Sequence, residues 1–212
     1  MSHDTNTTEP RLPEGILLEG IVTTLNDDGS PHIAPMGPIV NAEFTQVLLR
    51  PFRTSTTYQN LKRTGQGVLH VTDDVELFAR AAVGRLEELP RLLPATAIDG
   101  VILADACRWY SLRVDSVDDR DERTQILAKV VECGRLRDFL GFNRAKHAVI
   151  EAAILATRIH LLEAGHFRSE FERLAVVVEK TGGRQERSAF AFLQAYLGEQ
   201  LAPEARAETV RR

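Results

Sequence analysis

The sequence contains little cysteine and no long apolar run. Its two cysteines, Cys107 and Cys133, are too few and too far apart for a disulfide framework or a zinc cluster. The longest apolar candidate, residues 147–162, is interrupted by Glu151 and Arg158. A membrane-spanning helix needs about 18 or more consecutive apolar residues, so we predict that no segment of the chain spans a membrane.

An excess of positive charge is also missing. The chain has 26 Lys and Arg residues against 30 Asp and Glu residues, which gives a formal net charge of -4 at pH 7. Nucleic-acid-binding proteins usually carry a basic stripe, whereas the basic residues here are scattered, which argues against a nucleic-acid partner. Residues 1–14 lack the apolar core of a signal peptide, so we expect a flexible tail on a soluble, cytoplasmic protein.

Short strands are predicted up to about residue 136. An apolar, β-branched run covers Ile16–Leu25, a turn rich in Asp and Gly follows at residues 26–29, and a second strand begins near Pro31. Residues 89–103 contain two prolines, Pro90 and Pro94, and indicate an irregular loop. Further strands are expected at residues 42–52, 67–73, 108–117 and 124–133, with a short helix at 73–83 capped by Asp73 or Asp74. About six short strands at this spacing favour a barrel.

The periodicity becomes helical after residue 136. Asn143 is a candidate N-cap for a helix that we expect to end at Gly165, and small residues along one face permit close packing. Two more helices are predicted at residues 169–183 and 187–201. The expected organisation is a tail (1–14), a β-barrel (15–135), a small three-helix domain (136–202) and a polar tail (203–212).

The stretch "LRPFRTSTTYQNL", residues 49–61, places four consecutive hydroxyl side chains after an arginine. A phosphate group needs several hydrogen-bond donors, and a guanidinium, hydroxyls and the N–H groups of a helix start supply them. The expected donors are Arg53, Thr54, Ser55, Thr56 and Thr57, with Lys62 one turn further on. An ordinary helix start, capped by Ser55 or Thr56 beside an exposed Arg53, explains the same residues.

Patterns typical of metal ligands are weak. His147 and Glu151 are four residues apart on one predicted helix face, but no third ligand is spaced to join them. The acidic run at residues 115–123 lacks the spacing and the glycine of a calcium loop. We therefore expect no metal site and interpret both patterns as surface features.

The order of these signals resembles the FMN-binding split-barrel superfamily, which includes flavin reductases and proteins similar to pyridoxamine-phosphate oxidase. The resemblance is carried by residues 19–74: an apolar strand, the D-G-x-P hairpin "DGSPH", a strand ending in "APMG", the hydroxyl-rich turn and the "NL" of its helix. It implies a fold that is mainly β with added α, namely a split β-barrel of FMN-binding type followed by a small three-helix domain. Such a helical C-terminus resembles one branch of the superfamily.

The resemblance also implies FMN as cofactor and a homodimer with the flavin between two barrels. FMN is favoured over FAD because one compact phosphate site is present without a G-x-G-x-x-G turn. Beyond the hydroxyl-rich turn, the implied contacts are Thr23, Thr24, Ala34, Pro35, Met36, Gly37, Asn60, Lys62 and His70. A tight hairpin end explains residues 34–37 equally well. His70 stands where flavin reductases of the superfamily often have asparagine, and a strand histidine is more often a structural hydrogen-bonding group.

Two functions remain open at this stage. The first is an FMN-dependent oxidoreductase similar to flavin reductases, reduced by a nicotinamide nucleotide and acting on an unspecified small molecule. The second is a non-catalytic protein that binds flavin or another small ligand, because one fold supports several functions. In either case we expect the pocket to be walled by Met36 and by the helical domain around residues 143–151.

Overall fold

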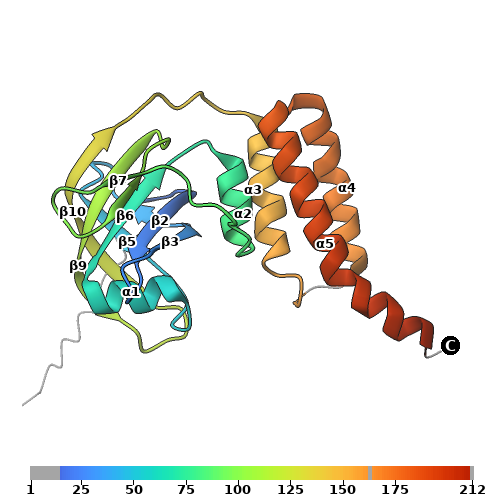
Figure 1. The fold of residues 1–212 in the computed structure, drawn as a ribbon, viewed down its shortest axis with the longest axis horizontal. Helices are drawn as coiled ribbons and strands as arrows, with labels where there is room; N and C mark the ends of the chain where they lie inside the picture. Colours follow the sequence, from blue (N-terminus) through green and yellow to red (C-terminus); the bar gives the residue numbers. More distant parts are fainter. Residues whose placement is uncertain (1–14, 162–163, 211–212) are drawn as a thin grey trace, which may run out of the picture.

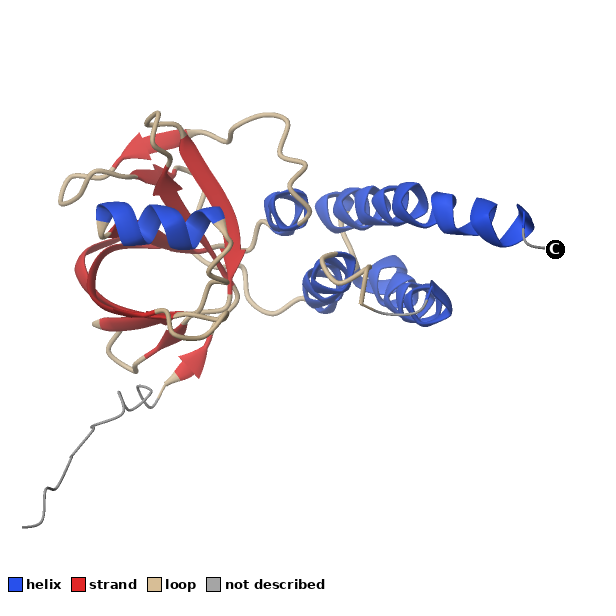
Figure 2. Cartoon of the chain, turned by 90° about the horizontal axis from the view of Figure 1, so that it is seen from below, coloured by secondary structure: helices blue, strands red, loops and turns tan. Residues whose placement is uncertain are grey.

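The computed structural model describes residues 15–161 and 164–210 and consists of a curled β-sheet beside a group of helices (Figure 1). The sheet has eight antiparallel strands in the order β1-β4-β5-β10-β9-β6-β2-β3. Its strands are β1 (Ile16–Leu17), β2 (Gly20–Leu25), β3 (Pro31–Met36), β4 (Ile39–Val40), β5 (Gln46–Leu49), β6 (Gln66–Val71), β9 (Arg108–Asp118) and β10 (Gln125–Arg135). The sheet curls into the split barrel expected from the sequence (Figure 2).

The first hairpin confirms the predicted turn. Strands β2 and β3 pair from Gly20↔Met36 to Leu25↔Pro31, and Gly29 in the connecting turn has a φ of 80° that favours glycine. The single strand expected over residues 16–25 is divided, because β1 pairs with β4 and not with β3. The break falls at Leu18 and Glu19, which places Glu19 between two strands.

The irregular loop expected over residues 89–103 is wrong. This segment forms a two-stranded antiparallel sheet of β7 (Leu92–Pro94) and β8 (Val101–Leu103). Between these strands Ile98 is buried, and it packs with Ile102 against Val68 of the barrel. Burial of these apolar side chains therefore outweighs the proline content that favoured an irregular loop.

Helix α1 (Thr56–Thr64) packs on the barrel with its buried face. Tyr58 and Leu61 join the core formed by the inward side chains of the strands, including Val22 and Leu112. Ser55 is the N-cap, and its side chain accepts a hydrogen bond from the N–H of Tyr58. Gly65 ends the helix with a φ of 67°. The packing therefore fixes both the position and the direction of the helix start.

Four further helices lie beside the barrel: α2 (Val75–Ala82), α3 (Arg144–Ala156), α4 (Ala164–Thr181) and α5 (Arg184–Val210). Asp74 caps α2 and Asn143 caps α3, as expected. Helix α3 ends at Ala156 and not near Gly165, which lies in the first turn of α4. Its buried alanine stripe also ends at Ala156, so packing that favours a helix stops there. Helix α5 continues past Pro203, where a polar tail was expected.

A second hydrophobic cluster joins the barrel to the helices. It includes Ile21 and Ile33 of the β2–β3 hairpin, Phe78 of α2, and the buried faces of α3, α4 and α5. Helix α2 thus lies between the hairpin and the C-terminal helices, where it fixes their relative position (Figures 1 and 2).

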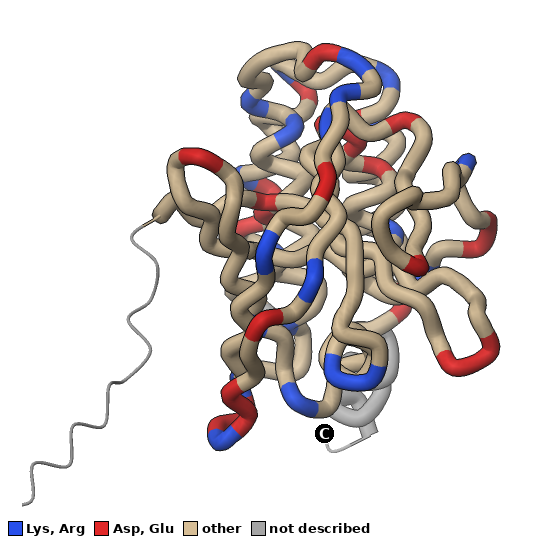
Figure 3. Tube along the Cα trace, turned by 90° about the vertical axis from the view of Figure 1, so that its left-hand side faces the viewer, with Lys and Arg blue, Asp and Glu red and all other residues tan. Residues whose placement is uncertain are grey.

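The surface carries charges of both signs. Lys and Arg alternate with Asp and Glu along the trace of the face seen in Figure 3. Across residues 15–161 and 164–210, no helix has both the length and the apolar character needed to cross a membrane.

Candidate functional site

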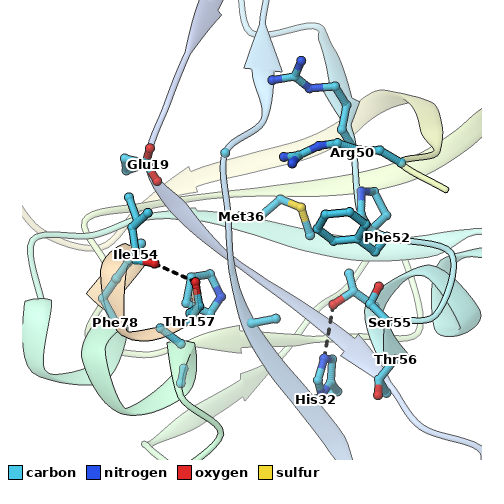
Figure 4. A pocket seen from close by; sticks show the side chains of 18 of the residues that line it. Glu19, His32, Met36, Arg50, Phe52, Ser55, Thr56, Phe78, Ile154 and Thr157 are labelled. Carbon is cyan, nitrogen blue, oxygen red and sulfur yellow. Dashed lines mark hydrogen bonds between the residues drawn. The ribbon is translucent and has the colours of Figure 1, made fainter. Parts of the chain in front are cut away.

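A cavity of about 530 Å³ lies between the barrel and the helices. Strand β3 runs along it, the segment between β5 and α1 lies on one side, and α2 and the end of α3 lie on the other (Figure 4). Figure 4 shows Met36 and His32 in the middle, with Arg50, Phe52, Ser55 and Thr56 on the first side. Glu19, Phe78, Ile154 and Thr157 are on the second.

Arg50 is one of the charged cavity residues that the sequence analysis missed. It follows β5 directly and lines the cavity. Its Nε atom is buried and has no hydrogen-bond partner in the part of the chain that the structure describes. A buried donor without an acceptor costs free energy, so this guanidinium is suited to an anion in the cavity.

The start of α1 lies next to Arg50 along the same wall. Ser55, Thr56 and Thr57 line the cavity, as the phosphate interpretation expects. Thr56 and Thr57 begin the helix, so their N–H groups have no acceptor one turn earlier within it. The Oγ1 atom of Thr57 lies 3.2 Å from Nε2 of His32, and burial lowers the pKa of His32. The positive charge of this wall therefore comes from arginine and not from His32.

A second arginine reaches this wall from the loop between β9 and β10. Arg123 lines the cavity, and its guanidinium carbon lies 5.2 Å from the centre of the Phe52 ring. A bridge between the backbones of Phe52 and Arg123 holds the two segments together. The loop thereby adds a second positive charge to this wall.

Arg53 and Thr54, the first two residues of the expected phosphate turn, lie away from the cavity lining. Both are exposed. Arg53 donates from Nη1 to the backbone oxygen of Asp119 at 3.3 Å, and its N–H donates to the oxygen of Glu122 at 2.8 Å. The structure therefore uses Arg53 to attach the turn to the β9–β10 loop.

Three more expected contacts, Thr24, Asn60 and Lys62, lie in or around α1 and away from the cavity. The amide of Asn60 donates to Oγ1 of Thr24 and to Oδ1 of Asn26, both at 3.0 Å. Lys62 lies 2.7 Å from Asp119 and 3.0 Å from the Tyr58 hydroxyl. These bonds attach α1 to the barrel, and none of Thr24, Asn60 and Lys62 lines the cavity.

Thr23 and His70 are buried in the barrel wall, away from the cavity lining. The Thr23 hydroxyl donates to the oxygen of Val101 at 2.6 Å. The His70 ring bonds Ile21 and Leu103 through its two nitrogens, and burial lowers its pKa to about 4. Thr23 therefore attaches β2 to β8, and His70 attaches β6 to β2 and β8.

The end of β3 also lines the cavity. Ala34, Pro35, Met36 and Gly37 all line the cavity, so the structure brings them together with Ser55, Thr56 and Thr57. Their backbone and the Met36 side chain form the floor between the two walls (Figure 4).

The opposite wall comes from α2 and from the end of α3. Phe78, Ala81 and Ala82 contribute apolar surface, and Ile154, Thr157 and Arg158 extend it beyond the helix. The expected contribution of residues 143–151 is wrong, since the lining begins at Ile154. Glu19 lies at the rim, where burial and the charge of Glu151 raise its pKa. Among the described residues, no group of three His, Cys, Asp or Glu side chains is placed to hold a metal ion.

Comparison with known proteins follows the same division of the chain. Two family models match the chain, and both are described as protein of unknown function (DUF447). Residues 18–137 match the model of the N-terminal domain, and residues 143–195 match the second model. An FMN-bound protein of Methanosarcina mazei, described with that family, has a TM-score of 0.69 at 22% identity, over 85% of this chain and 94% of its own.

Two other solved structures share the barrel. The flavin reductase HpaC in complex with NADP+ has a TM-score of 0.51 at 21% identity, over 60% of this chain and 82% of its own. Flavoredoxin of Methanosarcina acetivorans has a TM-score of 0.50 at 9% identity, over 56% of this chain and 68% of its own. These likenesses place the fold among FMN-binding split barrels, and the two family matches show that the chain belongs to the DUF447 family.

Proposed function

We propose that this protein is an FMN-dependent oxidoreductase that binds the cofactor in the cavity between the barrel and the helices. The observation that carries the proposal is the buried, unpartnered Nε of Arg50 beside the start of α1. A cavity wall with an arginine whose Nε atom is buried, three hydroxyls and a helix N-terminus is suited to a phosphomonoester.

The residues of this wall match the charge of the FMN phosphate. A phosphomonoester carries close to two negative charges at neutral pH, and Arg50 and Arg123 supply two positive ones. Ser55, Thr56 and Thr57 add hydroxyl groups around them. Among the described residues that line the cavity, no second wall combines two arginines with three hydroxyls and a helix start, as a pyrophosphate would need, which favours FMN over FAD.

The floor of the cavity suits a flat, mainly apolar ring. Met36 offers a polarisable apolar side chain, and the backbone around Pro35 and Gly37 offers polar atoms at the end of a strand. When bound, FMN supplies hydride chemistry, while the protein binds and orients it and limits the access of water. Phe78 and Ile154 on the helical wall would exclude water from the side opposite the phosphate wall.

The comparisons support the same proposal. The Methanosarcina mazei protein of the same family is described as FMN-bound, and HpaC is described as a flavin reductase. A nicotinamide nucleotide is the electron donor that we infer, because HpaC is described in complex with NADP+.

The test begins with cofactor binding. Titration of the purified protein with FMN should show about one site per chain, and riboflavin should bind much more weakly because it lacks the phosphate. Equal affinity for riboflavin would contradict the assignment of the Arg50 wall. Anaerobic mixing of the FMN-loaded protein with NADH or NADPH should then bleach the flavin absorbance within seconds. Bleaching no faster than that of free FMN would favour a non-catalytic binding protein.

A homodimer completes this proposal. Leu17 and Phe52 line the cavity and are 50% and 53% exposed, so apolar surface at its edge is open to solvent. A second copy covering these side chains would enclose a flavin and bury the short edge strand β1. Sedimentation of the FMN-loaded protein should give about twice the mass of 23.6 kDa. A monomer at micromolar concentration would contradict it.

A further inference from the structure

We propose that the helical end of the cavity is a second subsite, which binds the carboxylate of a small monoanionic ligand with an apolar body through Arg158. This inference rests on the proposed function, since it assigns the other end of the same cavity to the cofactor phosphate. It names the substrate class as small carboxylates.

The positively charged group of this end is Arg158. It lines the cavity just beyond the end of α3, and its guanidinium has no ion pair or hydrogen bond with any residue the structure describes. Its backbone N–H donates to the oxygen of Leu155 at 2.8 Å, which fixes the chain at this point. A guanidinium in this position offers paired donors that match a carboxylate.

The surrounding groups restrict the charge that can bind. The hydroxyl of Thr157 already donates to the oxygen of Ile154 at 2.7 Å, so Arg158 is the donor left for an anion. The C-terminal end of α3 and the carboxyl of Glu19 both add negative potential nearby. Because one arginine is the cation here and these two groups are negative, this end favours a ligand with one negative charge over a phosphate dianion.

The adjacent surface suits an apolar body. Phe78 is 5% exposed and, with Ala81, Ala82 and Ile154, forms the wall between Arg158 and the floor at Met36. An aromatic or aliphatic carboxylate can therefore place its charge on Arg158 and its body against this wall. Its body would then face the part of the cavity that we assign to the flavin.

Benzoate is the probe for the first experiment. Calorimetric titration with benzoate, on the FMN-free and the FMN-loaded full-length protein, should show binding at millimolar or lower concentration. Benzamide, which has the same shape without the charge, should bind at least about tenfold more weakly. Absence of benzoate binding at millimolar concentration, or equal binding of benzamide, would overturn the proposal.

Variants then locate the bound carboxylate. Arg158→Ala should raise the dissociation constant for benzoate at least about tenfold, and Arg158→Lys should raise it less because the charge remains. Arg144→Ala, an exposed arginine at the other end of α3, is the matched control and should not change it. Unchanged benzoate affinity in Arg158→Ala would overturn the assignment.

FMN titrations separate this inference from the proposed function. Arg158→Ala should keep the FMN affinity of the unsubstituted protein, and Arg50→Ala should keep its benzoate affinity. A loss of FMN affinity in Arg158→Ala would show that this end belongs to the cofactor site, and it would overturn the subsite. If FMN fails to bind the unsubstituted protein, the proposed function fails, while the benzoate titration of the FMN-free protein still decides the subsite.

Discussion

The His70 imidazole accepts a hydrogen bond from the backbone N–H of Leu103, with Nε2 and N 3.0 Å apart. Its other nitrogen, Nδ1, lies 3.1 Å from the oxygen of Ile21. These two bonds require the neutral ring with its proton on Nδ1. The barrel strand β6 is thereby joined to β8 through a fully buried histidine, and protonation of Nε2 would remove the acceptor that Leu103 uses.

The buried His70 should make the protein less stable in mild acid. Burial lowers its pKa to about 4 in the folded protein, whereas the unfolded chain has a value near 6.5. The unfolded state therefore takes up a proton first as the pH falls, and the stabilisation present above 6.5 is lost progressively toward 4. Between about pH 7.5 and about pH 5 this group alone should lower the free energy of unfolding by about 2 kcal/mol.

Denaturant unfolding of the unsubstituted protein and of His70→Gln at both pH values measures this contribution. Glutamine keeps an acceptor for the Leu103 N–H but does not titrate. The variant should lose less stability on acidification than the unsubstituted protein, and the difference reports His70 alone. Parallel losses in the two proteins would show that other groups cause the pH dependence.

The ion pair of Lys146 and Glu186 joins helix α3 to helix α5. Lys146 Nζ lies 2.8 Å from the Glu186 carboxylate, and these side chains are 15% and 8% exposed. Burial alone would raise the pKa of Glu186, but the hydrogen bond from Lys146 holds it below its usual value. Lys146→Met would leave the carboxylate unpaired, so we expect the free energy of unfolding to fall by about 3–5 kcal/mol.

A double substitution tests whether the unpaired charge is the cause. Glu186 also accepts the Gly183 N–H at 2.8 Å, and Lys146 donates to the backbone oxygen of Asp73 at 2.6 Å. Glu186→Gln keeps an acceptor for Gly183, so Lys146→Met with Glu186→Gln should recover much of the lost stability. Denaturant unfolding measures both proteins. No recovery would assign the loss to the Asp73 bond instead.

Close packing at Gly134 gives a third expectation. A Cβ atom on Gly134 would lie 2.6 Å from Nε1 of Trp109 on the paired strand, closer than atoms pack. Gly134→Ala should therefore lower the free energy of unfolding by about 1–3 kcal/mol. Gly198→Ala is the control, because a Cβ there meets nothing within 4 Å and lies within α5. The control should be stabilising by about 0.5–1 kcal/mol, and equal effects in thermal unfolding would contradict the packing argument.

Much of the fold could be predicted from the sequence because the signals for it are local. The turn at Gly29, the caps at Asp74 and Asn143, and the alternation of the strands depend on neighbouring residues, and the structure confirms them. The β7–β8 hairpin was missed because it depends on burial of Ile98 and Ile102 against a distant strand. The early end of α3 also depends on packing, since apolar residues continue beyond Ala156 in the sequence.

The site was predicted only in part for the same reason. The hydroxyl residues Ser55, Thr56 and Thr57 lie at the cavity because a helix start fixes them locally. Sequence proximity favoured Arg53 as their partner, but the chain turns at Arg53 and Thr54 and directs Arg53 to the β9–β10 loop. An arginine directly after a buried strand was the signal in the sequence that could have identified Arg50. No such signal existed for Arg123, because it is more than sixty positions from the turn in the sequence.

Substitution of Arg50 and of Arg53 tests which of the two arginines binds the phosphate next to the hydroxyl-rich stretch. Arg50 lines the cavity with a buried, unpartnered Nε, whereas Arg53 is exposed and bonds the backbone of Asp119. Arg50→Ala should therefore weaken FMN binding by about 2 kcal/mol or more, since charge-assisted bonds to a desolvated phosphate are lost. Arg53→Ala, only three residues away, should leave FMN affinity nearly unchanged and serves as the matched control.

Fluorescence titration with FMN measures both variants, and riboflavin supplies the second comparison. Weak riboflavin binding should be the same in all three proteins, because neither arginine contacts a ligand without a phosphate. Unfolding midpoints of the variants show whether either substitution disturbs the fold. If Arg53→Ala loses FMN affinity while Arg50→Ala retains it, the phosphate lies on the outer side of the turn, and the cavity holds another ligand.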